Sequence, residues 1–299
     1  MITLTDVEAV RRRCDEARHA GQTIGLVPTM GKFHEGHRAL MRAARAETDL
    51  VVVSLFVNPT QFGAGEDLAG YPRDPEGDAS AAAAEGVDVL FTPTVAGMYP
   101  GTPRTTVHVE GVTARLCGAS RPTHFDGVAT VVTKLFSIVG PCRAYFGRKD
   151  AQQVAVVRRL VADLNLPVTV VGVPLVRDAD GLARSSRNTY LDDEQRRAAT
   201  VLSRALRHAA EALHGGARDG RALVGAVAAA IDAEPGVRLD YAELVDAATI
   251  EPVTGVAGEQ VLAVAAYVGP ARLIDNLGIV THGAEVETDL GVVVEEQLA

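Results

Sequence analysis

The chain has 299 residues, of which 47% are hydrophobic and 22% are charged, and its formal net charge is -9 at pH 7. This length allows one large domain or two smaller ones, and the balance of apolar and charged residues is typical of a globular protein. The acidic charge, with no basic run longer than Arg11–Arg13, argues against a broad nucleic-acid-binding surface.

The first part of the chain alternates strand-like and helix-like segments. Short apolar runs rich in β-branched residues predict strands that are buried on both faces of a parallel sheet, at 23–28, 49–58, 87–93, 142–147 and 167–174. Helical patterns lie between them, at 37–47, 74–86, 125–139 and 150–164. This alternation predicts a doubly wound, Rossmann-like α/β domain.

The sequence pattern changes after about residue 190. Two alanine-rich amphipathic helices are expected at 192–216 and 219–236, followed by strands of a small sheet within 237–247 and 260–277. We therefore predict a Rossmann-like catalytic domain over 1–178 and a smaller α+β domain over 179–299. The structure of the acidic segment from about residue 281 is left open.

Four polar stretches each follow a predicted strand. They read "TMGKFHEGH" from Thr29, "NPTQFGAGED" from Asn58, "GRKDAQQ" from Gly147 and "RDADGLARSSRN" from Arg177. Ligands of open parallel sheets bind where the loops at the carboxyl ends of neighbouring strands meet. We expect the four stretches to contribute to one site.

The first stretch is close to two known motifs without matching either. Gly31 and Gly36 have the spacing of a GxxxxGK[ST] phosphate loop, but His37 and Arg38 replace its lysine and hydroxyl residue. The histidines are also one residue too close for the HExxH motif of zinc proteases. One interpretation is a polar turn that starts a helix. The sharper one is a phosphate site, because the N–H groups of a helix start favour anions.

The other stretches are ambiguous when each is taken alone. Lys149 places a positive charge beside a predicted helix start, where Asp150 can simply cap the helix. The serines and arginines of "RSSRN" at 184–188 can wrap a phosphate or form an exposed loop. Gln61 and Gln153 can bind a carboxylate or hydroxyls, although most surface glutamines are only solvated.

Six ordered motifs resemble one known family when they are taken together. They are "PTMGKFHEGH", "FVNPTQF", "YPRD", "LCGASRPTHFDGVATVVTKLF", "YFGRKDAQQ" and "RDADGLARSSRNTYL". The family is that of the pantothenate synthetases, or pantoate–β-alanine ligases. The resemblance runs from about residue 20 to residue 192, with a weaker echo in "RLIDN" at 272–276. The HxGH motif alone would indicate only the wider superfamily of nucleotidyltransferases and class I aminoacyl-tRNA synthetases.

The resemblance implies a reaction in two steps. ATP and pantoate give pantoyl adenylate and pyrophosphate in the presence of Mg²⁺, and β-alanine then attacks the acyl carbon to release pantothenate and AMP. In-line attack of a carboxylate on the α-phosphorus depends on positioning and charge stabilisation. The family also implies a homodimer and a second domain that acts as a lid.

The resemblance further implies roles for individual residues. Catalysis is assigned to His34, His37, Lys149 and Arg187, with His37 as proton donor. Gln61 and Gln153 would hold pantoate, with Gln61 also near β-alanine, and Asp78 is the candidate magnesium ligand. The ATP site would comprise Met30, Gly31, His34, Gly36, His37, Gly147, Arg148, Lys149, Asp150, Val176, Arg184, Ser185, Ser186 and Arg187.

Some positions depart from the family pattern. Arg184 stands where a methionine is usual before "SSRN", and Gly77 stands where an acid is expected near the magnesium. Lys32 and Phe33 replace a small or polar residue and a leucine. The metal assignment is affected more than the function, because the phosphates of ATP supply most ligands of such a magnesium ion.

The remaining expectations concern compartment and alternatives. The N-terminus lacks the apolar core of a signal peptide, no apolar run is long enough for a membrane span, and the three cysteines have no CxxC spacing, so the cytoplasm is expected. The closest rival function is another adenylyl- or cytidylyltransferase, which needs no amine acceptor. A non-catalytic nucleotide-binding protein and a tRNA-binding synthetase relative are weaker alternatives.

Overall fold

The computed structural model describes residues 1–63, 65–66 and 68–294. Residues 64 and 67 of the second polar stretch and the last five residues of the C-terminal segment therefore lie outside the described part. The chain divides into two compact units: unit 1 comprises Met1–Gly147 and Val156–Val173, and unit 2 comprises Arg148–Ala155 and Pro174–Ala299. The short segment that carries Lys149 thus belongs to unit 2, although both of its neighbours in the sequence belong to unit 1.

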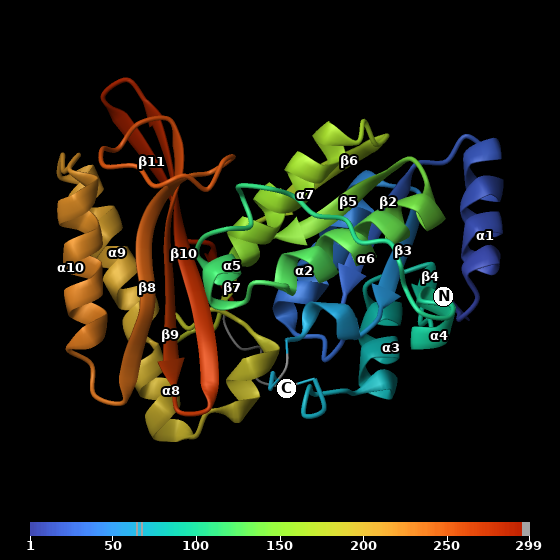
Figure 1. The fold of residues 1–299 in the computed structure, drawn as a ribbon, viewed down its shortest axis with the longest axis horizontal. Coiled ribbons are helices and arrows are strands. Elements are labelled where there is room, and N and C mark those ends of the chain that lie inside the picture. Colours follow the sequence, from blue (N-terminus) through green and yellow to red (C-terminus); the bar gives the residue numbers. More distant parts are fainter. Residues whose placement is uncertain (64, 67, 295–299) are drawn as a thin grey trace. The chain divides into compact units, whose positions relative to one another are not determined.

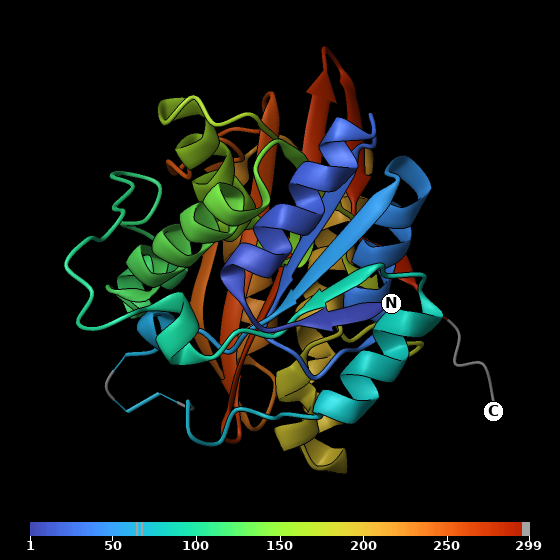
Figure 2. The same cartoon turned by 90° about the vertical axis from the view of Figure 1, so that its right-hand side faces the viewer.

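A parallel sheet forms the centre of unit 1 (Figure 1). Within the described residues its order is β1-β4-β3-β2-β5-β6, and every neighbouring pair is parallel. This confirms the predicted doubly wound α/β class. The short edge strand β1, which the sequence pattern did not indicate, lies beside β4 (Figure 2). The strands are β1 (Ile2–Leu4), β2 (Ile24–Thr29), β3 (Leu50–Leu55), β4 (Val89–Phe91), β5 (Cys142–Gly147) and β6 (Val168–Val173).

Helices cover both faces of this sheet. Val27, Val51 and Val53 belong to a buried cluster with residues of α2 and α3, whereas the alternating Leu26 and Val52 are equally buried on the other face. Burial on both faces explains why these strands are apolar throughout. The helical elements are α1 (Val7–His19), α2 (Glu35–Glu47), η1 (Pro59–Gln61), α3 (Pro75–Ala84), α4 (Val95–Met98), α5 (Cys117–Ser120), α6 (His124–Val139) and α7 (Ala151–Asp163), whose first turn belongs to unit 2.

The strand order places a switch point between β2 and β5. From β2 the chain moves outward through β3 and β4 and then returns to add β5 on the other side of β2. Loops on opposite sides of a switch point diverge and leave room for a ligand at the carboxyl edge. The candidate loop Met30–His34 follows β2 at this edge, and β5 ends there at Gly147.

Unit 2 has an antiparallel sheet of order β11-β10-β9-β8 in its described part, with α9 and α10 on one face (Figure 1). Leu206 and Leu213 of α9 and Ile231 of α10 are fully buried against Val264 and other apolar residues of the strands. The smaller α+β part was correctly predicted. The elements are η2 (Arg148–Asp150), β7 (Val176–Arg177), η3 (Ser186–Tyr190), α8 (Asp193–Ala199), α9 (Val201–His214), α10 (Gly220–Asp232), β8 (Val237–Asp246), β9 (Glu259–Val268), β10 (Ala271–His282), β11 (Glu285–Asp289) and β12 (Val292–Val293).

Two features of unit 2 differ from the sequence expectation or complete it. The single helix expected over 192–216 is two helices, because it breaks at Thr200. The segment left open from residue 281 continues β10, adds β11 and then pairs β12 with β7 in parallel, as far as it is described. No helix in the described ranges is both long enough and apolar enough to cross a membrane.

Candidate active site

The start of α2 is built around two histidine rings. His34 is the N-cap residue, and its Nδ1 accepts a hydrogen bond from the backbone N–H of Gly36 at 3.1 Å. His37 reaches back, and its Nδ1 accepts from the backbone N–H of His34 at 3.3 Å. The ring centroids lie 4.1 Å apart. Because both Nδ1 atoms act as acceptors, each neutral ring carries its proton on Nε2, which makes Nε2–H the donor for chemistry.

Glycine is required between the two histidines for a steric reason. A Cβ on Gly36 would lie 2.9 Å from Cε1 and 3.0 Å from Nδ1 of His34. Gly31 has a φ of +93°, and a Cβ there would lie 2.7 Å from the Leu55 side chain and 2.9 Å from a carboxylate oxygen of Asp78. The two glycines let the loop after β2 turn sharply and let the imidazole of His34 lie against the helix start.

Asp78, the predicted magnesium ligand, is buried and holds this loop from α3. Its Oδ2 accepts from the backbone N–H of Lys32 at 2.9 Å, and its Oδ1 accepts from that of Phe33 at 2.6 Å. Burial raises the pKa of the Asp78 carboxyl above its ordinary value, against the opposing effect of these hydrogen bonds. Both oxygens are therefore engaged with the protein, and the described residues contain no group of three or more His, Cys, Asp or Glu that could hold a metal ion.

Gln61 is a buried residue of η1, and its neighbours fix both its side chain and its backbone. Its Oε1 accepts from Nδ2 of Asn58 at 3.1 Å, and its Nε2 lies 3.1 Å from the sulfur of Met30. The Gln61 carbonyl oxygen lies 2.9 Å from Nδ1 of His124 and accepts from Arg121 at 3.3 Å. Unit 1 thus brings a predicted ATP residue, Met30, into contact with a predicted pantoate residue, Gln61.

Most of the other candidate residues lie in unit 2. The segment Gly147–Asp150 passes from β5 into η2, and the amine of Lys149 lies 3.9 Å from the carboxylate of Asp150. Arg148 pairs with Asp289 at 2.9 Å. Gln153 lies in the first turns of α7, next to the buried Gln152, as the sequence indicated.

The "RSSRN" stretch forms the short helix η3 and its cap. Ser185 caps the helix by accepting from the backbone N–H of Arg187 at 3.3 Å, and Ser186 and Arg187 lie within it. The backbone N–H of Arg184 donates to the carbonyl of Val176 at 2.9 Å, so these two predicted ATP residues do meet. The Arg184 side chain pairs with Asp178, which also binds Arg196. The guanidinium of Arg184, which occupies the position of the family's usual methionine, is therefore held in an ion pair with Asp178.

Sequence reasoning missed the residues that orient the predicted ones. Asn58 is part of the "FVNPTQF" motif, and its position directly after a predicted strand is a signal that the sequence offers. Its contact with Gln61, however, depends on the fold of η1. Asp275 and Asn276 of "RLIDN" contact unit 2 residues that are far away in sequence, and no local spacing indicates those partners. Tyr99 donates to Asn58 across 41 positions and had no signal at all.

Comparison with known proteins gives a family match over most of the chain. Residues 2–278 match the model of the family described as pantoate-beta-alanine ligase. The pantothenate synthetase of Syntrophotalea carbinolica is 55% identical over 276 residues, which cover 92% of this chain and 98% of that relative. The pantothenate synthetase of Heliobacterium modesticaldum is 58% identical over 262 residues, which cover 88% of this chain and 93% of that relative.

Solved structures agree with this match. The crystal structure of pantothenate synthetase from Thermus thermophilus superimposes with a TM-score of 0.88 at 48% identity, covering 92% of this chain and 98% of that one. The pantoate-beta-alanine ligase from Francisella tularensis, complexed with beta-gamma ATP and β-alanine, gives a TM-score of 0.75 at 32% identity and covers 92% of this chain and 97% of that one.

Proposed function

Because the chain belongs to the pantoate–β-alanine ligase family, it condenses pantoate with β-alanine to pantothenate at the expense of ATP, and we propose which of its residues carry the reaction. The reaction passes through pantoyl adenylate, the family's standard intermediate, and releases pyrophosphate and AMP. The residue assignments rest on the family resemblance and are supported by the geometry within each unit. The observation that carries them is the pair of histidines whose Nδ1 atoms accept backbone N–H groups at the start of α2, from which we infer that Nε2–H is the donor of each neutral ring.

In the first step a carboxylate oxygen of pantoate attacks the α-phosphorus of ATP, and pyrophosphate leaves. We assign His34 and His37 to the phosphate oxygens on which negative charge grows. The N-terminus of α2 adds its backbone N–H groups and the positive end of the helix dipole. Donors that are already oriented before the reaction stabilise the transition state without further reorganisation. In this tautomer Nε2–H of His37 is the proposed hydrogen-bond donor to the leaving pyrophosphate, whereas the proton-donor role that the resemblance implies would need the ring in its charged form.

Residues of unit 2 supply positive charge in this assignment. Lys149 gives a mobile ammonium group, and Arg187 gives a guanidinium that can bind phosphate through two N–H groups. Ser185, Ser186 and the backbone around η3 add neutral donors. The supporting observations are that Asn276 holds the backbone of η2 and that Asn188, within η3, donates through Nδ2 to the carbonyl of Ala183 just before that segment.

Pantoate and β-alanine are assigned to the two glutamines. Gln61 is held at its side-chain oxygen by Asn58 and at its backbone by His124, so its amide has one orientation to offer to a ligand. A neutral amide binds hydroxyls and carboxylates without adding charge. Gln153 on α7 has the same chemistry. In the second step the amine of β-alanine attacks the acyl carbon of the adenylate and AMP leaves.

Magnesium is proposed to enter as the complex with ATP. The carboxylate of Asp78, the predicted ligand, already accepts two backbone N–H groups, so the donor set does not fit a metal site made by the protein itself. The phosphate oxygens would then supply most of the ligands. A homodimer, a cytoplasmic location and a lid role for residues 179–299 rest on the family resemblance and complete the proposal.

Exchange of labelled pyrophosphate into ATP tests the proposed first step. We expect exchange that requires pantoate and magnesium and proceeds without β-alanine, because the adenylate forms reversibly. Adding β-alanine should convert the intermediate and release AMP. With a rival nucleotidyltransferase, pyrophosphate exchange into ATP would instead depend on another acceptor, and β-alanine would have no effect. A folded protein that binds ATP and shows no pantoate-dependent exchange would contradict the assignment.

A further inference from the structure

The "RLIDN" motif at 272–276 has no role in the reaction described so far, although it forms the middle of β10. Its last two residues are both polar and both buried, with Asp275 3% and Asn276 7% exposed. Successive side chains of a strand point to opposite faces, so the two residues act in different surroundings. Buried polar groups are kept in place by hydrogen bonds, and their partners show what they organise.

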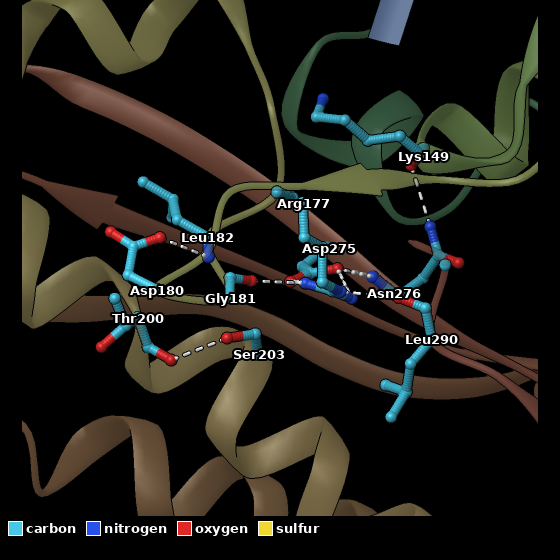
Figure 3. Close-up of polar contacts among 12 residues, drawn as sticks. Lys149, Arg177, Asp180, Gly181, Leu182, Thr200, Ser203, Asp275, Asn276 and Leu290 are labelled. Carbon is cyan, nitrogen blue, oxygen red and sulfur yellow. Dashed lines mark hydrogen bonds and ion pairs between the residues drawn. The ribbon is translucent and has the colours of Figure 1, made fainter. Parts of the chain in front are cut away.

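Asn276 holds the backbone on both sides of Lys149. Its Nδ2 donates to the carbonyl oxygen of Arg148 at 3.0 Å and to that of Lys149 at 2.9 Å. A side-chain amide nitrogen has two hydrogens, so both are used. The two carbonyls belong to the peptide planes before and after the Lys149 Cα. Fixing both planes fixes the direction in which the Lys149 side chain leaves the backbone. Figure 3 shows Asn276 facing the Lys149 carbonyl while the lysine side chain extends away from the network.

A buried ion pair braces Asn276 from the other face of β10. Asp275 binds Arg177 through both oxygens, at 2.6 and 2.8 Å, and its Oδ1 also accepts the backbone N–H of Asn276 at 2.7 Å. Arg177 uses its other N–H groups on two carbonyls, those of Gly181 at 3.1 Å and Leu290 at 2.6 Å (Figure 3). Gly181 lies in the turn that leads into "RSSRN", so one network anchors η2 and the approach to η3.

We propose that Asn276 is a positioning residue for ATP use, which acts through Lys149 and is braced by the Arg177–Asp275 pair. This inference rests on the proposed function of Lys149 as a phosphate ligand. The contacts explain how a residue whose two amide N–H groups are both bound to the backbone would affect ATP use. The two side-chain N–H groups of Asn276 go to the carbonyls of Arg148 and Lys149, and neither is left for a substrate. The competing explanation is that Asn276 only stabilises unit 2.

A double-mutant cycle separates the two explanations. Asn276→Asp keeps the side-chain volume but replaces the two N–H donors with an oxygen that repels the carbonyls. We expect it to raise the KM for ATP in pyrophosphate exchange by roughly tenfold, the usual effect of a lost hydrogen bond near a charged ligand. Lys149→Ala alone should raise this KM as much or more. In the Lys149→Ala background, Asn276→Asp should change the KM by less than about twofold, because its target is gone.

Asn165→Asp is the matched control, since it makes the same charge change on an exposed residue after α7. It should leave the KM for ATP unchanged. If the fold-changes in the KM for ATP of Asn276→Asp and Lys149→Ala multiply in the double variant, Asn276 has a general structural role and the proposal is overturned. If Lys149→Ala leaves the KM for ATP unchanged, Lys149 is not a phosphate ligand, and the inference about Asn276 is then wrong as well.

A milder variant guards against a loss of folding. Asn276→Ser keeps a hydroxyl donor and adds no charge, so it should fold and should raise the KM for ATP through the same dependence on Lys149. Circular dichroism and thermal melting of each variant report the fold independently of activity. If both Asn276 variants fail to fold while Asn165→Asp folds normally, the residue is structural and the proposal is wrong.

Discussion

At the scale of single residues, the two histidines combine a structural and a chemical task. Each uses Nδ1 to accept a backbone N–H at the start of α2, and this choice places the proton of the neutral ring on Nε2. An aspartate would cap the helix as well but would offer no donor. The helix start therefore orients the same rings that we assign to the phosphates of ATP.

Substitutions of His37 can separate the two tasks. An asparagine at this position would offer an oxygen near the place of Nδ1, and a glutamine would offer an amide N–H near the place of Nε2. We expect His37→Asn to melt close to the wild type and to lose roughly 10²–10³ in turnover, the usual effect of removing an oriented donor. His37→Gln should retain more turnover and lose more thermal stability. The measurement is steady-state AMP release beside a thermal melt.

The opposite ranking of the two variants would assign the chemistry to Nδ1 and contradict the proposed tautomer. Equal turnover in both, within a few-fold of the wild type, would remove His37 from catalysis. Each variant acts on a different nitrogen, so the comparison does not depend on the absolute stability of either one.

The sequence predicts the residues that act through local geometry and misses those that act through distant contacts. Gly31, Gly36 and the histidines lie within seven positions, and their strand–turn–helix context is readable from the chain. The task of Asp78 is not readable, because its partner N–H groups lie 45 and 46 positions away. An acid in the first turn of a helix looks the same in a sequence whether it binds a metal, faces solvent or holds a loop.

At the scale of elements, the close approach of α6 to η1 fixes the position of Gln61. A Cβ on Gly127 would lie 2.4 Å from the carbonyl oxygen of Thr60 and 2.5 Å from the backbone N and Cα of Gln61. The carbonyl oxygen of Gly127 in turn accepts from Nδ2 of Asn58 at 3.1 Å. The atoms that a side chain would meet are backbone atoms, so rotating a side chain cannot relieve the overlap.

Gly127→Ala is therefore expected to push α6 away from η1. We predict a loss of about 1–3 kcal/mol in the free energy of unfolding, as for overpacking, together with a raised KM for pantoate. Gly225→Ala in α10 is the control, because a Cβ there meets nothing within 4 Å. That change should stabilise the protein by about 0.5–1 kcal/mol and leave the kinetics alone. Denaturant unfolding measures the free energy of unfolding, and pantoate titration measures the KM. An unchanged KM for pantoate in Gly127→Ala would show that the packing of α6 against η1 does not position Gln61 for pantoate.

Element types were predictable where burial dictates composition, and element ends were less so. The inner strands β2, β3 and β4 of the parallel sheet are apolar because both faces are covered, and that pattern is visible in one sequence. The break between α8 and α9 was not visible. Thr200 donates its hydroxyl to the carbonyl of Arg197 at 2.7 Å, and its backbone N–H binds the same carbonyl at 3.3 Å, three residues back. This tight turn ends α8, although the apolar spacing continues into α9.

At the scale of the whole molecule, the C-terminal segment belongs to the structure that carries Lys149 and Arg187. β12 pairs with β7 in parallel, and the backbone N–H of Val292 donates to the carbonyl of Leu175 at 2.7 Å. The Leu290 carbonyl accepts from Arg177, the centre of the buried network of unit 2. A strand of two residues has no periodicity to read, which is why the sequence left this segment open.

Gly291 allows this closure, and its replacement tests what the closure does. Its φ is +81°, and a Cβ there would lie 2.1 Å from the Leu175 carbonyl oxygen. Gly291→Ala should separate β12 from β7, displace the Leu290 carbonyl from Arg177 and raise the KM for ATP, with a loss of about 1–3 kcal/mol in unfolding free energy. Gly283→Ala controls for backbone strain, because its φ of +65° is similar and a Cβ there meets nothing within 4 Å. Equal losses of stability in the two variants, with unchanged ATP kinetics, would show that the loss comes from backbone strain at the positive φ. The pairing of β12 with β7 would then not support ATP use.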